Sequence, residues 1–169
     1  MHGLFPDTEL QTGAIFSPCR TYRYILWRVW DISRPLVLFI ALNPSTADER
    51  KNDPTIRREI DFATRWGGGG LIKGNLFGFR SKDPSALARV IDPVGPENDK
   101  TIREFAADCL IKVAAWGADK AVTEARVEAM LGILGECHCL GVTKDGHPKH
   151  PLYLAKKTPL VPFKWTRAA

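Results

Sequence analysis

The sequence predicts a three-layer α/β/α domain with a central, mainly parallel four-stranded sheet plus an extra strand on its N-terminal side. Leu36–Leu42 is an unbroken apolar run, which is typical of a strand covered on both faces by helices. Strand and helix patterns then alternate through most of the chain, which favours parallel core strands. A length of 169 residues fits a single hydrophobic core.

The segment before the apolar run supplies the extra strand. Residues 1–20 carry Gly and Pro with little periodicity, whereas 22–29 is an alternating run rich in aromatic and β-branched residues, followed by a turn at 31–35. We therefore expect an extended lead-in segment over 1–20, one domain over 21–155 and a basic C-terminal tail over 156–169.

Helix starts are marked by Asp-Pro pairs. Asp53 can cap free N–H groups and Pro54 suits the first helical position, and Asp83-Pro84 repeats this signal. Glycines 67–70 end the first of these helices. The other expected elements are strands over 36–42, 71–79, 111–116 and 137–142, a helix that begins after Pro96, and a helix over 119–134.

Composition and charge limit the class of protein. Hydrophobic residues make up 44% and charged residues 25%, which excludes a disordered or fibrous chain. No apolar run approaches the roughly 20 residues of a membrane span, and the first ten residues resemble no signal peptide, so we expect a cytoplasmic protein without a membrane partner. The formal charge of +5 permits a nucleic acid or nucleotide as partner without requiring one. The oligomeric state stays open.

The four cysteines do not predict a metal site or disulfides. No C-x-x-C pair occurs, and Cys137-His138-Cys139, taken as a strand, places both thiols on one face with the imidazole opposite. That arrangement offers two ligands at most, so small buried residues are the simpler interpretation. We expect neither a metal nor a cofactor.

Polar side chains gather where the core strands end. Ligands of open parallel sheets bind beyond the carboxyl ends of the strands, and Asn43 follows the first core strand, Asn75 lies in the second and His150 follows the fourth. We predict Asn43 and His150 as catalytic residues, because a carboxamide can orient water and an imidazole can donate to an oxygen that gains charge. The predicted substrate-binding residues are Pro44, Ser45, Thr46, Asn75, Phe77, Phe79, Arg80, Lys144 and His147.

Structural interpretations of the same residues stay open. Asn43-Pro44 also suits a simple turn, and Asn75 can instead satisfy the backbone of a neighbouring loop. His147 competes with His150 for one role. Phe77 and Phe79 can stack on a ring or fill the core, and the nearby arginines can be solvated charges rather than phosphate ligands.

The chain resembles domain-of-unknown-function family 1643, which occurs in bacteria and phages. The resemblance spans about residues 20–155 and implies no activity by itself. The segments that carry it are Tyr24–Trp27, Leu42–Asp48, Asp53–Arg58, Gly74–Arg80, Asp92–Asp99 and Thr143–Tyr153.

A more distant resemblance suggests an activity. An apolar strand ending in Asn-Pro, a second strand carrying Asn and a late His-Pro together are similar to the uracil-DNA glycosylase superfamily. This implies that Asn43 positions the attacking water, Asn75 reads the base and His150 stabilises the departing base. Ser45 stands where mismatch-specific members usually have Gly, Leu152 stands where Ser normally follows His-Pro, and the iron–sulfur cysteines of some members are absent.

We therefore expect a glycosylase-like pocket that binds a nucleobase and hydrolyses its N-glycosidic bond in DNA or in a nucleotide. The alternative is a non-catalytic module on the same fold that binds a nucleotide, a nucleic acid or a protein. Release of a free base distinguishes the first from the second.

Overall fold

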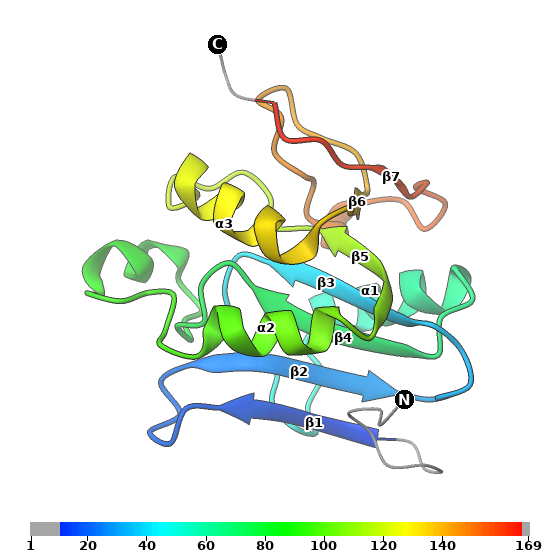
Figure 1. The fold of residues 1–169 in the computed structure, drawn as a ribbon, viewed down its shortest axis with the longest axis horizontal. Helices are drawn as coiled ribbons and strands as arrows, with labels where there is room; N and C mark the ends of the chain where they lie inside the picture. The colour runs from blue at the N-terminus through cyan, green and yellow to red at the C-terminus, as the bar shows by residue number, and fades with distance from the viewer. Residues whose placement is uncertain (1–10, 167–169) are drawn as a thin grey trace.

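The computed structural model describes residues 11–166 and shows one mixed sheet with helices on both faces (Figure 1). The sheet has seven strands in the order β1-β2-β4-β3-β5-β6-β7. The strands are β1 (Gln11–Phe16), β2 (Arg23–Val29), β3 (Leu36–Ala41), β4 (Gly70–Asn75), β5 (Cys109–Ala114), β6 (His138–Cys139) and β7 (Val161–Pro162). The helices are α1 (Pro54–Arg65), α2 (Asn98–Ala106) and α3 (Glu124–Leu134), with the 3₁₀ helices η1 (Pro84–Arg89) and η2 (Pro151–Tyr153).

The α/β class is confirmed, but the prediction of a four-stranded, mainly parallel sheet is wrong. β3 runs parallel to β4 and β5, and β5 runs parallel to β6. The pairs β1–β2, β2–β4 and β6–β7 are antiparallel. The predicted core strands therefore lie side by side, and antiparallel strands extend the sheet at both ends.

The added strands come from segments without a strong strand pattern. β1 lies in the expected lead-in and β7 in the expected tail, and β7 is only two residues long. Neighbouring backbone supplies the hydrogen bonds that make them strands, so their own sequence needs little periodicity. Residues 1–10 of the expected lead-in and 167–169 of the expected tail lie outside the described residues.

Each face of the sheet has its own hydrophobic core. On one face Ile102 of α2 and Met130 of α3 are completely buried against the sheet. On the other face Ile56 and Phe62 of α1 pack with Phe39 of β3. The caps expected for α1 and η1 are confirmed: Asp53 accepts a hydrogen bond from the Ile56 N–H at 2.9 Å, and Asp83 accepts one from the Ser85 N–H. In residues 11–166, no helix combines the length and the hydrophobicity of a membrane span.

A register shift in β2 changes which face its first residue meets. Ile15 of β1 pairs with Ile25, but the next residue, Phe16, pairs with Arg23, so Tyr24 is an extra residue. Such a bulge re-aims the side chains on one side of it. Ile25 accordingly packs in the α2 core, while Arg23 donates from Nη1 to the Ala47 carbonyl, in the α1 core.

A buried ion pair joins α1 to the sheet. Lys73 of β4 donates from Nζ to Oε1 of Glu59 at 2.5 Å, and both side chains are at most 5% exposed. Burial raises the pKa of Glu59, while the charge of Lys73 opposes that rise. The attraction between the two charges offsets part of the free energy that it costs to remove each from water.

Loss of one member of this pair is expected to destabilise the fold strongly. Lys73→Met leaves the Glu59 carboxyl buried without its partner, so the free energy of unfolding should fall by about 3 to 5 kcal/mol. The double variant Glu59→Met with Lys73→Met removes both charges and should lose less. Urea denaturation followed by circular dichroism compares them. A double variant less stable than the single variant contradicts this account.

Candidate functional site

Several polar side chains lie between α1 and the sheet, in the region that the carboxyl ends of β3 and β4 share. We call this group the polar centre. Its members are Arg23, Asp53, Glu59, Lys73, Asn75 and His150. Four of them are almost completely buried, and the charge of Asp53 acts on Arg23, on Glu59 and on His150.

Asn75 is the most unusual member. It is the last residue of β4 and shares its sheet face with Lys73, because side chains alternate along a strand. Gly74 between them faces α2, where an added Cβ would lie 3.0 Å from Ile102. The Asn75 side chain is completely buried, and neither its Oδ1 nor its Nδ2 has a hydrogen-bond partner among the described residues. Buried polar atoms nearly always have partners, so this carboxamide is poised to bind a polar group.

Other unpaired polar atoms lie on the same face of the sheet. Oε2 of Glu59 and Nε of Arg23 are buried without a partner among residues 11–166. Burial lowers the pKa of Arg23 to about 10, which leaves the guanidinium charged at neutral pH. The polar centre thus offers further hydrogen-bonding capacity beside Asn75.

His150 adds a neutral donor. Its Nδ1 accepts a hydrogen bond from the Leu152 N–H at 3.3 Å, so the hydrogen of the neutral ring lies on Nε2. Burial, helped by the charge of Lys73, lowers the pKa of His150 to about 4, and the charge of Asp53 opposes this shift. An added Cβ on Gly117 would lie 3.6 Å from the Cβ of His150, which places the histidine beside the segment after β5.

Asn43 connects two loops. Its Nδ2 donates to the carbonyls of Pro44 at 3.1 Å and Ser81 at 2.9 Å, and more weakly to that of Phe79 at 3.5 Å. The amide nitrogen therefore ties the loop after β3 to the segment after β4. Its Oδ1 takes no part in these bonds.

Two arginines of β2 hold the loop after β3 from the other side. Arg23 donates to the Ala47 carbonyl at 2.6 Å. Arg28 donates to the Asp48 carbonyl at 2.7 Å and to Oδ1 of Asn52 at 2.8 Å. Residues 43–53, which carry the Asn-Pro pair and the cap of α1, are thereby fixed to the sheet.

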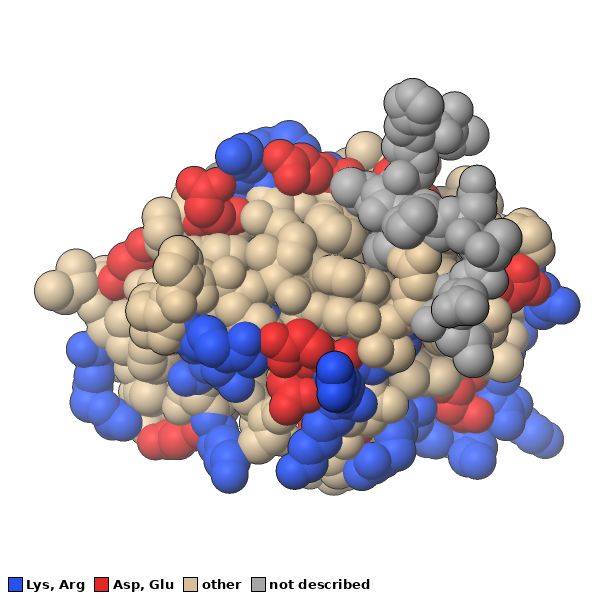
Figure 2. Space-filling model, turned by 90° about the horizontal axis from the view of Figure 1, so that it is seen from below, with Lys and Arg blue, Asp and Glu red and all other residues tan. Residues whose placement is uncertain are grey.

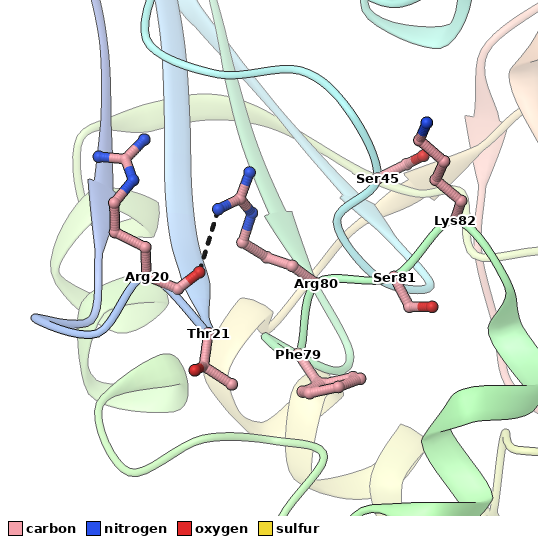
Figure 3. A pocket seen from close by; sticks show the side chains of 7 residues that line it. All are labelled: Arg20, Thr21, Ser45, Phe79, Arg80, Ser81 and Lys82. Carbon is pink, nitrogen blue, oxygen red and sulfur yellow. Dashed lines mark hydrogen bonds between the residues drawn. The ribbon is translucent and has the colours of Figure 1, made fainter.

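A separate open pocket contains three predicted site residues, Ser45, Phe79 and Arg80 (Figure 3). We call it the basic pocket; its volume is about 330 Å³. The residues that line it are Arg20, Thr21, Ser45, Phe79, Arg80, Ser81 and Lys82.

The remaining predicted residues lie outside both places. Phe77 is buried in the core on the α2 face, in agreement with the alternative that it fills the core. The ring of His147 packs against Trp165 at 5.2 Å, so it does not share the position of His150. Pro44 is buried in the loop after β3, and the side chains of Thr46 and Lys144 are exposed.

Sequence reasoning missed Arg23, Asp53, Glu59 and Lys73 as site residues. Asp53 was predicted only as a helix cap. Glu59 stands on the apolar face of α1, and Lys73 interrupts the apolar run of β4. The signal available in the sequence was a charged residue at a position where the pattern predicts an apolar one.

Surface charge does not define a continuous binding face in the view of Figure 2. Lys and Arg side chains gather mainly in the lower half of that view, with Asp and Glu side chains among them. Residues 11–166 contain no cluster of three or more His, Cys, Asp or Glu side chains placed to hold a metal ion. The polar centre and the basic pocket are the two candidate ligand sites.

Residues 23–152 match the family described as "Protein of unknown function (DUF1643)", and the chain belongs to that family. The predicted membership is confirmed. No curated protein and no solved structure matches the chain significantly. The resemblance to the uracil-DNA glycosylase superfamily gains no support from these comparisons.

Protonation of His150 should lower the stability of the fold. Its pKa is about 4 in the folded chain and 6.5 as a reference, so the unfolded chain binds more protons between these values and folding weakens as the pH falls through that range. His150→Asn keeps an acceptor for the Leu152 N–H but cannot titrate. Urea denaturation at about pH 7, 5.5 and 4 should show a smaller loss in the variant than in the wild type. Equal losses contradict the assignment.

Proposed function

We propose that the chain binds a nucleobase at the polar centre and hydrolyses its N-glycosidic bond. The observation that carries this proposal is the carboxamide of Asn75, which is completely buried and unpaired. His150 belongs to the same group of side chains. A planar heterocycle with adjacent donors and acceptors is the ligand class that such a carboxamide suits best.

Burial makes this recognition selective. A base whose edge pairs with both Oδ1 and Nδ2 satisfies the carboxamide, whereas a base with the wrong edge leaves a buried polar atom unpaired. Sites of this kind reject mismatched ligands strongly. The polar centre is therefore suited to distinguish one base from another.

His150 supplies the second part of the chemistry. When the bond between the sugar carbon and the base nitrogen breaks, its electron pair leaves with the base, and negative charge develops on the ring and its oxygens. The Nε2–H of the neutral imidazole donates a hydrogen bond to such an oxygen.

A water molecule completes the reaction by adding its oxygen to the sugar carbon and passing a proton to the released base. We assign its orientation to Oδ1 of Asn43, the atom that the loop contacts leave out. Asn75 is fully covered, so a ligand reaches it only when a covering segment moves.

One observation favours a second candidate function. The Asn43 amide nitrogen is already used on loop carbonyls, which suits a structural residue as well as a catalytic one. The same polar centre could then bind a nucleotide or a nucleic acid without hydrolysing it.

Base release should depend on Asn75 and His150. Oligonucleotides containing uracil or damaged bases, single- and double-stranded, are incubated with each protein and the freed base is quantified by chromatography. Removal of the carboxamide (Asn75→Ala) or of the imidazole (His150→Asn) should slow release by about 100-fold or more, since each takes away a donor that stabilises the departing base. His138→Asn, in β6 and outside the polar centre, is the matched control and should release base normally.

Equal release by the wild type and by both variants rejects the proposed catalytic roles. Binding without release in the wild type supports the second candidate function. Binding that survives Asn75→Ala unchanged rejects the polar centre as the ligand site.

A further inference from the structure

Three cationic residues and three residues that carry hydroxyl groups line the basic pocket (Figure 3). Arg20 and Thr21 come from the turn between β1 and β2, Ser45 from the loop after β3, and residues 79–82 from the segment after β4. Guanidinium groups, an ammonium group and hydroxyls are the side chains that most often bind phosphate oxygens. The volume of about 330 Å³ leaves room for such a group.

The positive charge of the pocket is only partly balanced. Arg20 pairs with the Glu49 carboxylate at 2.8 Å. In the part of the chain that the structure describes, no carboxylate pairs with Arg80 or Lys82. The pocket therefore keeps an excess of two positive charges, which an anion would neutralise.

The two arginines are held close together before any ligand arrives. Their guanidinium carbons lie 3.8 Å (Arg20) and 4.8 Å (Arg80) from the centre of the Phe16 ring. Nη1 of Arg80 donates to the Arg20 carbonyl at 3.0 Å, and Nε of Arg80 is buried without a partner among residues 11–166. Like charges held against one ring repel each other, so an anion bound near them offsets this repulsion.

The backbone of Arg20 is also unusual. Its φ is 58°, and no other non-glycine residue among residues 11–166 has a positive φ. Most side chains avoid this conformation, and residues forced into it tend to occur at functional positions. The turn thus accepts a strained residue where glycine would fit more easily, and that residue supplies a guanidinium to the pocket.

The basic pocket adjoins the polar centre. The Arg80 N–H donates to the Thr21 carbonyl at 3.0 Å and the Arg23 N–H donates to the Gly78 carbonyl at 2.9 Å, so the segment that carries Arg80 pairs with the start of β2. Asn43 donates to the Ser81 carbonyl and lies two residues before Ser45, and the loop that it begins ends at Asp53 of the polar centre. A ligand that spans them carries a planar base at one end and an anion at the other.

We infer that the basic pocket binds a phosphate group of the nucleotide or nucleic acid whose base enters the polar centre. Anion binding stands on the pocket alone, and the link to a base rests on the proposed function. Arg80 and Lys82 bind the phosphate oxygens directly, and the hydroxyl of Ser45, which lies beside Lys82, completes the site.

The test compares two double variants with the same net charge. Arg80→Gln with Lys82→Gln removes the unbalanced charges of the pocket. Arg103→Gln with Lys120→Gln removes two exposed charges elsewhere. The probes are inorganic phosphate, a nucleoside, its 5′-monophosphate and a fluorescein-labelled single-stranded oligonucleotide, measured by calorimetry and fluorescence anisotropy at several salt concentrations.

The wild type and the Arg103/Lys120 control should bind the phosphate-bearing probes, with affinity that falls as salt rises. The Arg80/Lys82 variant should bind them about tenfold or more weakly, and the slope of log affinity against log salt for the single-stranded oligonucleotide should fall by about 0.7, the value for one phosphate. Similar affinities for the monophosphate and the oligonucleotide identify a free nucleotide as the source of the phosphate. Much tighter oligonucleotide binding identifies a strand.

Binding by the Arg80/Lys82 variant that equals the control overturns the inference, as does equal affinity of the wild type for the nucleoside and its monophosphate. None of these readouts needs base release. If the wild type releases no base but the Arg80/Lys82 variant loses phosphate binding, the proposed hydrolysis fails while the phosphate site stands.

Discussion

The buried ion pair between Lys73 and Glu59 is the interaction on which the polar centre depends. It places two opposite charges where α1 packs on β4, in a region that would otherwise be filled with hydrocarbon. Because each charge offsets the desolvation of the other, this face of the sheet can hold further polar groups. Asn75 lies two residues beyond Lys73 on the same face, and the charge of Lys73 helps to keep His150 neutral.

Around this pair, the loop after β3 links the two candidate ligand positions. Arg23 and Arg28 bind its backbone from β2, and Asn43 joins it to the segment after β4. The bulge at Tyr24 is what gives Arg23 access to that loop. A change in the position of residues 43–53 would therefore alter the polar centre and the basic pocket together. This coupling suits a ligand whose base and phosphate must be held at a fixed separation.

The positions of some candidate site residues were predictable from residue patterns. Asn75 and His150 were expected at the carboxyl edge of the sheet, and both belong to the polar centre. Asn43 was expected beside them, yet its amide nitrogen holds two loops together. Arg80 and Ser45 were expected at the substrate, and they line the basic pocket. Arg20 was not predicted, because its place in the pocket depends on the turn between β1 and β2 and on contact with Phe16.

The sequence by itself determined the α/β class, the caps of α1 and η1, and the family to which the chain belongs. These properties follow from local patterns: the apolar run of β3, the Asp-Pro pairs and the motif segments. Only the tertiary structure decided the antiparallel edges of the sheet, the pairing of Lys73 with Glu59 and the meeting of Arg20 with Arg80. Such features depend on contacts between residues far apart in the chain, and a buried charge becomes interpretable only when its partner is known.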